Sequence, residues 1–134
     1  MSNAATVQEI YAAFGTGDVE TILGHIAEDC AWESWEHDHS AQAAGVPLML
    51  ERRGPAGCAE FFGVAAGYDI RDFQVLDIIG DGRQVAVEVV IHSVAPGGGE
   101  VRDEELHLWT FDDAGKVARL RHYTDTAVHI AAHA

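Results

Sequence analysis

Basic residues are scarce in this chain of 134 residues. Asp and Glu together number 22, Lys and Arg together number eight, and Lys116 is the single lysine. The formal net charge at pH 7 is therefore −14 with the histidines neutral. Such a negative field repels phosphate backbones and anionic membrane surfaces. We expect neither nucleic acids nor membranes as partners.

Long apolar runs and cysteines are also few. The longest segment without Asp, Glu, Lys or Arg runs from His39 to Leu50, whereas a membrane-spanning helix needs about 20 residues. Residues 1–7 hold no basic residue and no apolar run, so we expect no signal peptide. The cysteines are limited to Cys30 and Cys58, which predicts a reduced, cytoplasmic protein whose thiols lie in the core.

The remaining composition is that of one globular domain over residues 1–134. Apolar residues make up 48% of the chain, enough to build a core, and no internal repeat or linker divides it. Gly97, Gly98 and Gly99 lie between two expected strands rather than before a helix, so they do not form a phosphate-binding loop. We therefore expect no nucleotide and no other cofactor.

Apolar spacing predicts helices first and strands later. Thr6 and Asp18 are the expected N-caps of the first two helices. The expected helices cover residues 6–15, 18–27 and 55–66, with a short one after Asp125. The expected strands cover residues 30–35, 68–79, 84–94, 101–111 and 116–125, and residues 36–53 form a loop excursion. Helices that precede a run of antiparallel strands predict an α+β fold with the helices packed on one sheet face.

Side-chain alternation divides the later strands into two faces. The valine face of strand 84–94 consists of Val85, Val87, Val89 and Ile91. We group the opposite side with the polar side of strand 101–111 and call this group the mixed face; it comprises Glu88, Val90, His92, Glu105, His107, Trp109 and Phe111. In the last strand Leu120 and His122 alternate with Arg119, Arg121 and Tyr123.

Alternation alone leaves two orientations open. In one, the valine face packs on the helices and the mixed face lies in water. In the other, the mixed face lines a pocket and the valine face needs an apolar cover, such as a second subunit. Two large exposed aromatics, Trp109 and Phe111, would need a reason, which favours the second orientation.

Three segments of the chain resemble SnoaL-like proteins of the nuclear transport factor 2-like (NTF2-like) superfamily. They are Val7–Phe14 followed by Gly17-Asp18, Leu23–Trp32, and Asp113–Val117 with Arg121–Thr126. The resemblance covers nearly the whole chain apart from residues 36–53. It implies an NTF2-like cone, in which a strongly bent antiparallel sheet packs on three helices of the N-terminal half and encloses a pocket, and a homodimer joined through the outer sheet face.

The resemblance does not select an activity, because relatives include polyketide cyclases, ketosteroid isomerases, limonene epoxide hydrolases and dehydratases. The epoxide hydrolases carry an Arg and an Asp where this chain has Glu88 and Val90, and an acid where it has His122. Epoxide hydrolysis is therefore disfavoured. Asp125 resembles the acid that polyketide cyclases use as a base, but its parity differs from that of His122, so we expect it to cap the terminal helix.

His107 is the first candidate for chemistry. With the mixed face inward, Glu105 orients its imidazole and His122 lies on the neighbouring strand, an arrangement suited to general acid–base catalysis. The alternative is a histidine that is exposed or held for structure. We expect an isomerase, cyclase or dehydratase acting on a mostly apolar or aromatic small molecule; the alternative is a ligand-binding homodimer without catalysis.

The expected ligand pocket contains six further residues. The resemblance implies Trp32 and Ser34 on the first strand, although Trp32 is as well explained as core, and the inward mixed face supplies the others: Glu88, His92, Trp109 and Phe111. The segment His37-Asp38-His39 places two imidazoles on one side of an extended chain, which with a pocket histidine could bind zinc. No Cys or His partner lies at a recognised spacing, so we expect a solvated loop and no metal.

Overall fold

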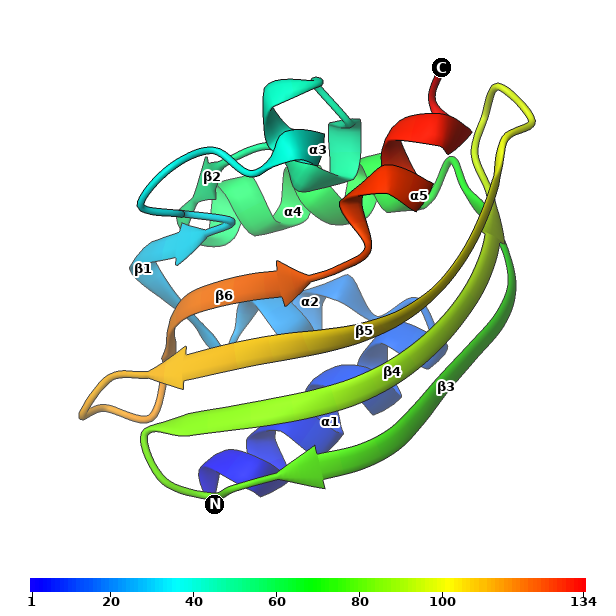
Figure 1. Cartoon of the computed structure of the whole chain (residues 1–134). Helices are drawn as coiled ribbons and strands as arrows, with labels where there is room; N and C mark the ends of the chain where they lie inside the picture. The colour runs from blue at the N-terminus through cyan, green and yellow to red at the C-terminus, as the bar shows by residue number, and fades with distance from the viewer.

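The computed structural model describes residues 1–134 and shows a strongly bent sheet that wraps around helices (Figure 1). The strands are β1 (Ile26–Trp32), β2 (Arg52–Arg53), β3 (Asp69–Ile79), β4 (Gln84–Val94), β5 (Glu100–Phe111) and β6 (Val117–Tyr123). Their order in the sheet is β2-β1-β6-β5-β4-β3. The helices are α1 (Asn3–Gly15), α2 (Val19–Leu23), α3 (Ser40–Ala43), α4 (Gly54–Ala65) and α5 (Thr126–Ala132), with a 3-10 turn at Pro47–Met49.

The first helices differ from the prediction at their ends. The N-cap of α1 is Ser2 rather than Thr6, because the Ser2 hydroxyl accepts the Ala5 N–H at 3.1 Å. Asp18 caps α2 as predicted, accepting the Thr21 N–H. However, α2 ends at Leu23 and β1 begins at Ile26, so the last residues of the predicted helix and the start of the strand were misassigned.

The segment 36–53 is more ordered than the expected loop. It contains α3, the 3-10 turn and β2, which pairs with the end of β1. Gly54 then begins α4 with φ at +67°, a conformation that favours glycine. A residue with a side chain would also clash at this position, because its Cβ would lie 2.5 Å from the Glu28 carbonyl oxygen.

The predicted α+β cone is confirmed, and the sheet differs in one detail. Strands β3, β4, β5 and β6 pair antiparallel in chain order. Strand β1 runs parallel to β6, so the sheet is mixed rather than wholly antiparallel. This pairing places the segment after β1 beside the end of β6, where residues from distant parts of the chain meet (Figure 1).

Both predicted orientations of the sheet were partly wrong, because they assumed an incorrect register between β4 and β5. Val87 pairs directly with His107, and Val89 with Glu105. Directly opposed residues of an antiparallel pair share a face. The valine face and His107 therefore both point inward, toward the helices, whereas Glu88 points to the outer face.

The core lies between the inner sheet face and the helices. Its residues come from α1, β1, α4 and the long strands, and include Val7, Ile10, Trp32, Val85, Val87, Val89, Trp109, Phe111, Val117 and Leu120. Cys30 and Cys58 belong to the same core as free thiols, and burial raises the pKa of each to about 12. None of the helices combines the length and apolar character that crossing a bilayer requires.

Candidate functional site

Three imidazoles and three carboxylates gather at the inner face of the bent sheet. Strand alternation directs Asp103, Glu105, His107 and Trp109 of β5 inward. His122 of β6 pairs with His107, and their ring centroids lie 4.4 Å apart. The remaining members arrive from elsewhere: Glu33 follows β1, and His129 projects from α5.

His107 is held at both ring nitrogens. Its Nδ1 lies 2.6 Å from the Tyr11 hydroxyl and its Nε2 lies 2.9 Å from Glu105 Oε1. Since an ionised carboxylate only accepts, Nε2 carries the proton, and Nδ1 accepts from the hydroxyl. The same hydroxyl accepts the Trp109 indole N–H at 3.1 Å.

The protonation of this group follows from its burial. Burial lowers the pKa of His107, and His122 lowers it further, against the raising effect of Glu105. Burial also favours the neutral form of Tyr11, and for a phenol this raises the pKa. His107 is thus a neutral imidazole, and Tyr11 a neutral phenol, in a chain of hydrogen bonds whose donors and acceptors all match.

His122 forms a second unit with Glu33. One oxygen, Glu33 Oε1, accepts both the ring Nδ1–H of His122 at 2.6 Å and its backbone N–H at 2.7 Å. The other oxygen accepts the Trp35 indole N–H at 3.1 Å. Glu33 is fully buried and has φ at +57°, the one non-glycine residue with positive φ. Backbone strain of this kind persists where the surroundings impose it, commonly at functional sites.

The pKa values of this pair move apart. Burial favours the neutral form of each, but the charge of His122 and the hydrogen bonds to Glu33 lower the pKa of the carboxyl. The charge and hydrogen bond of Glu33 outweigh burial and raise the pKa of His122. The pairing therefore favours the imidazolium–carboxylate form relative to an isolated imidazole and carboxyl. The hydrogen bonds of His122 involve its backbone N–H and Nδ1, and its ring Nε2 makes none within the chain.

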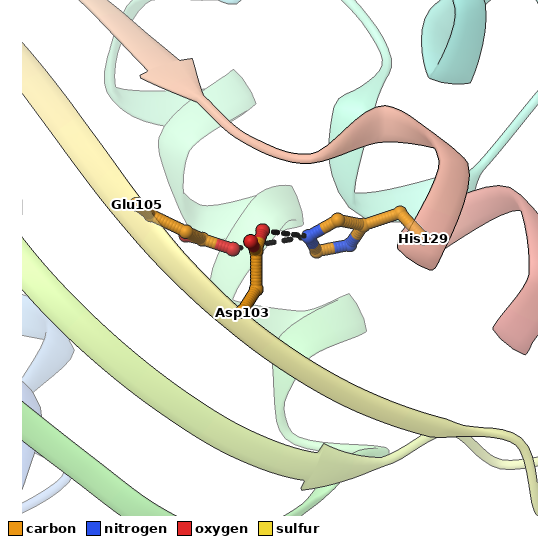
Figure 2. Close-up of side chains that lie close together, drawn as sticks. All are labelled: Asp103, Glu105 and His129. Carbon is orange, nitrogen blue, oxygen red and sulfur yellow. Dashed lines mark hydrogen bonds and ion pairs between the residues drawn. The ribbon is translucent and has the colours of Figure 1, made fainter.

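The third unit lies where β5 faces α5 (Figure 2). Nε2 of His129 is 3.0 Å from Asp103 Oδ2 and 3.0 Å from Glu105 Oε2. Burial raises the pKa of Asp103 to about 6, assisted by Glu105. The pKa of Glu105 is lowered, since hydrogen bonds from His107 and His129 outweigh its burial, and the pKa of His129 is raised by the same carboxylates. These three side chains could hold a metal ion.

Two small hollows adjoin these side chains. The α5-side hollow has a volume of about 70 Å³, and Glu105, His129, Met49 and Tyr68 are among its lining residues. The α1-side hollow also measures about 70 Å³ and is lined by Ile10, Tyr11, Trp32 and Trp109 among others. Five residues line both hollows: Phe14, Phe61, Phe73, His107 and His122. Both imidazoles thus stand at the partition between two mostly apolar spaces.

The sequence matches the SnoaL-like domain over residues 7–120, most of its length. The chain belongs to the SnoaL-like family. No curated protein matches the sequence.

Solved structures share the fold of this SnoaL-like domain. An NTF2-like protein from Burkholderia thailandensis is 20% identical with a TM-score of 0.81, over 100% of this chain and 98% of that one. A Mycobacterium tuberculosis protein in complex with estradiol-17β-hemisuccinate is 19% identical with a TM-score of 0.70, over 92% and 94%. Δ5-3-ketosteroid isomerase from Mycobacterium sp. is 20% identical with a TM-score of 0.70, over 96% and 97%. Likeness at these identities establishes the fold alone.

Some predicted pocket residues of the SnoaL-like domain lie elsewhere. Glu88 and His92 are corrected to the outer sheet face, because they pair with Leu106 and Arg102, whose side chains point outward. Phe111 is buried in the core and lines neither hollow.

The segments flanking the strands also differ from expectation. Ser34 lines neither hollow and offers its carbonyl oxygen to Arg121. Asp125 stands at the N-cap position of α5 without a side-chain capping bond, and it lines only surface depressions. His39 caps α3 through Nδ1, so it serves a local structural purpose in the segment that sequence reasoning considered for zinc.

The structure brings His107, Glu105, His122, Trp32 and Trp109 together as the sequence suggested. It adds four residues that sequence reasoning did not select for the site: Tyr11, Glu33, Asp103 and His129. Asp103 could have been found, since it shares its parity with Glu105 and His107. Nothing in the sequence pairs Glu33 with a residue 89 positions away.

Proposed function

We propose that this SnoaL-like protein is an enzyme that transfers a proton on a mostly apolar small molecule, in an isomerisation, cyclisation or dehydration. The observation that carries the proposal is the free Nε2 of His122. The ring lines both hollows, its Nδ1 is bonded to buried Glu33, and its hydrogen bonds to the chain involve Nδ1 and the backbone N–H but not Nε2. An imidazole oriented by a carboxylate and open to a ligand is suited to general acid–base catalysis.

In this proposal His122 and His107 have different roles. In its neutral form His122 takes a proton at Nε2 from a carbon next to a carbonyl; Glu33 stabilises the imidazolium that forms, which then returns the proton to the product. Both nitrogens of His107 are hydrogen-bonded, to Tyr11 and Glu105. His107 therefore contacts the ligand as an uncharged ring and transfers no proton. Glu105 is the positioning residue that fixes its tautomer.

The lining residues favour an apolar substrate with one hydrogen-bond acceptor. Phe14, Phe61 and Phe73 form much of both walls. Trp32 lines the α1-side hollow, and its indole N–H is buried without an acceptor. Buried donors are normally paired, so an oxygen of the substrate is the expected partner. Buried carboxylates nearby disfavour anionic ligands. A steroid-sized molecule needs about 300 Å³ or more, which exceeds the two hollows of about 70 Å³ each taken together, so the phenylalanines must move to enlarge the space as well as to join it.

Deuterium exchange in D₂O tests this function without a known product. The protein is incubated with cyclic ketones, including a Δ5-3-ketosteroid and a monoterpenoid ketone, and deuterium at the carbon next to the carbonyl is measured by mass spectrometry. We expect exchange above the buffer rate for at least one ketone. His122→Asn retains a donor for Glu33 but lacks the free nitrogen, and we expect it to lose about 10²–10⁴-fold in rate.

His92→Asn is the matched control, because His92 lies on the outer face. It should exchange at the wild-type rate. Equal rates for His122→Asn and the wild type, with both proteins folded, would reject the role of His122. No exchange with any ketone, together with saturable binding of the same compounds, would instead support a ligand-binding protein without catalysis.

That second function has its own support. A relative with this fold is known in complex with a steroid hemisuccinate.

The outer sheet face exposes large apolar side chains, namely those of Ile79, Leu106 and Tyr123, with Leu106 directly opposite Tyr123. We propose that this face joins two subunits. Light scattering after size exclusion should show a dimer that Leu106→Glu dissociates; a wild-type monomer at all concentrations would contradict this.

A further inference from the structure

The cluster of Asp103, Glu105 and His129 shares Glu105 with the proposed site, whereas Asp103 and His129 take no part in the proposed proton transfer. Figure 2 shows the two carboxylates of β5 and the imidazole of α5 pointing toward a common centre. The ligand atoms of the three side chains lie within 4.8 Å of one another. Their side chains are only 4%, 6% and 5% exposed, respectively.

The charge of this cluster is unbalanced. The ion-pair partners of both carboxylates are imidazoles, and no Lys or Arg pairs with either. A single Nε2–H of His129 stands between Asp103 Oδ2 and Glu105 Oε2. Buried charges are normally paired or coordinate a metal. A divalent cation in place of that proton would balance both carboxylates.

We infer that Asp103, Glu105 and His129 bind one divalent first-row transition metal ion. With metal–ligand bonds of about 2.1 Å, adjacent ligand atoms lie about 3.0 Å apart at 90° and about 3.4 Å apart in a tetrahedron. The two distances from His129 Nε2 are 3.0 Å each. The spacings from His129 to each carboxylate therefore already suit coordination, and the ligand atoms of Asp103 and Glu105 lie within 4.8 Å of each other.

The ligand types restrict the metal. One imidazole nitrogen with two carboxylate oxygens suits Mn²⁺, Fe²⁺ or Zn²⁺. Ca²⁺ requires six to eight oxygens, and Mg²⁺ prefers oxygen and retained water. The cluster holds no thiolate, which disfavours softer ions such as Cu⁺.

The surroundings hold the ligands and leave the ion accessible. The His107 Nε2–H fixes Glu105 Oε1, and the Asp125 backbone N–H fixes Asp103 Oδ2 at 3.1 Å. Such outer contacts orient metal ligands. Glu105 and His129 line the α5-side hollow, and Asp103 lines a surface groove, so solvent spaces adjoin all three ligands.

The unpartnered Nδ1 of His129 limits the affinity that we expect for the metal ion. Coordination through Nε2 places the ring proton of His129 on Nδ1, which is buried and has no partner. Metal-bound histidines usually donate that proton to an acceptor, and losing such support costs about 10–100-fold in affinity. We therefore expect binding weaker by this factor than at a fully supported site, with one ion per chain.

Metal stoichiometry tests the inference directly. The full chain is treated with a chelator, incubated separately with Mn²⁺, Fe²⁺ under nitrogen, Zn²⁺ and Co²⁺, and desalted before elemental analysis; calorimetry gives the affinity. We expect one ion per chain, with Co²⁺ giving visible absorption bands that report its coordination. Asp103→Asn and His129→Gln should each bind more than about 100-fold less tightly.

Glu104→Gln is the matched control, because Glu104 lies on the same strand with its side chain exposed on the outer face. It should bind like the wild type. Unfolding curves establish that each variant is folded. Absence of stoichiometric binding by the wild type would overturn the inference. So would binding unchanged in folded Asp103→Asn, or binding lost instead on replacing His37.

Discussion

Glu33→Gln is the sharpest test of how the site is built. The substitution keeps the shape of the side chain but removes its charge and turns one acceptor oxygen into an NH₂ donor. In the wild type, Oε1 accepts two hydrogen bonds from His122 and Oε2 accepts one from Trp35. The variant amide can satisfy His122 through its oxygen, but its NH₂ group then faces the indole N–H of Trp35.

The expected destabilisation follows from these contacts. Removing one partner of a buried ion pair costs about 3–5 kcal/mol, and the retained amide oxygen recovers about 1 kcal/mol as a neutral hydrogen bond. Glu33 is fully buried, so solvent does not screen the pair. We expect the free energy of unfolding to fall by about 2–4 kcal/mol at pH 6.

The loss should depend on pH in a defined direction. The pKa of His122 is raised, so its stabilisation is complete below the unfolded value of about 6.5 and is lost as pH rises through the folded pKa. The pKa of Glu33 is lowered, so its contribution is complete above about 4.5 and is lost as pH falls through the folded pKa. Three more charged or titratable groups face His122: Glu105, His107 and His129. They are common to both proteins, so the difference should be largest between about pH 4.5 and 6.5.

Urea unfolding of the wild type and Glu33→Gln across pH 4 to 9 measures this difference, and NMR of the imidazole protons follows the pKa of His122. Glu104→Gln, at an exposed position, is the control. A loss below about 0.5 kcal/mol at pH 6, or a His122 pKa that does not fall in the variant, would refute the pairing that we describe.

Three further tests by urea unfolding address other parts of the fold. Tyr11→Phe leaves a buried acceptor and a buried donor unpaired and should cost about 2–4 kcal/mol; a loss under 0.5 kcal/mol would contradict the hydrogen-bond chain. Gly54→Ala should cost well over 1 kcal/mol, because strain adds to a backbone clash, whereas Gly17→Ala, also at positive φ but in open space, should cost less; equal losses would count against the clash. Val87→Ala should cost about 2 kcal/mol and Val90→Ala clearly less, and the reverse order would place the valine face outside.

Most of the fold could be predicted from local features of the sequence. The helical spacing in α1, α2 and α4 and the turn at Asp81-Gly82 identified the elements, because these features depend on residues close in sequence. The register between β4 and β5 was beyond such signals. One strand's alternation says which residues share a face, but the pairing of Val87 with His107 depends on the length and geometry of the intervening turn.

The candidate site was predictable to the same degree. His107, Glu105 and His122 stand out because ionisable residues interrupt apolar strands. Tyr11 does not stand out, since its ring fits the apolar stripe of a helix and only its hydroxyl reaches His107. Glu33 comes directly after the short strand β1 and lies between Trp32 and Trp35 in the sequence. Its partner, His122, is brought to it by the parallel pairing of β1 with β6.

That parallel pairing also orders events in time. The acid after β1 and the imidazole on β6 are 89 positions apart, so during synthesis the acid leaves the ribosome long before its partner exists. Closing so large a loop is slow relative to forming the neighbouring hairpins. The Glu33–His122 pair can therefore form only when the final strand docks, and a chain released early would keep an uncompensated carboxylate in its interior, a defect that quality-control proteases could recognise.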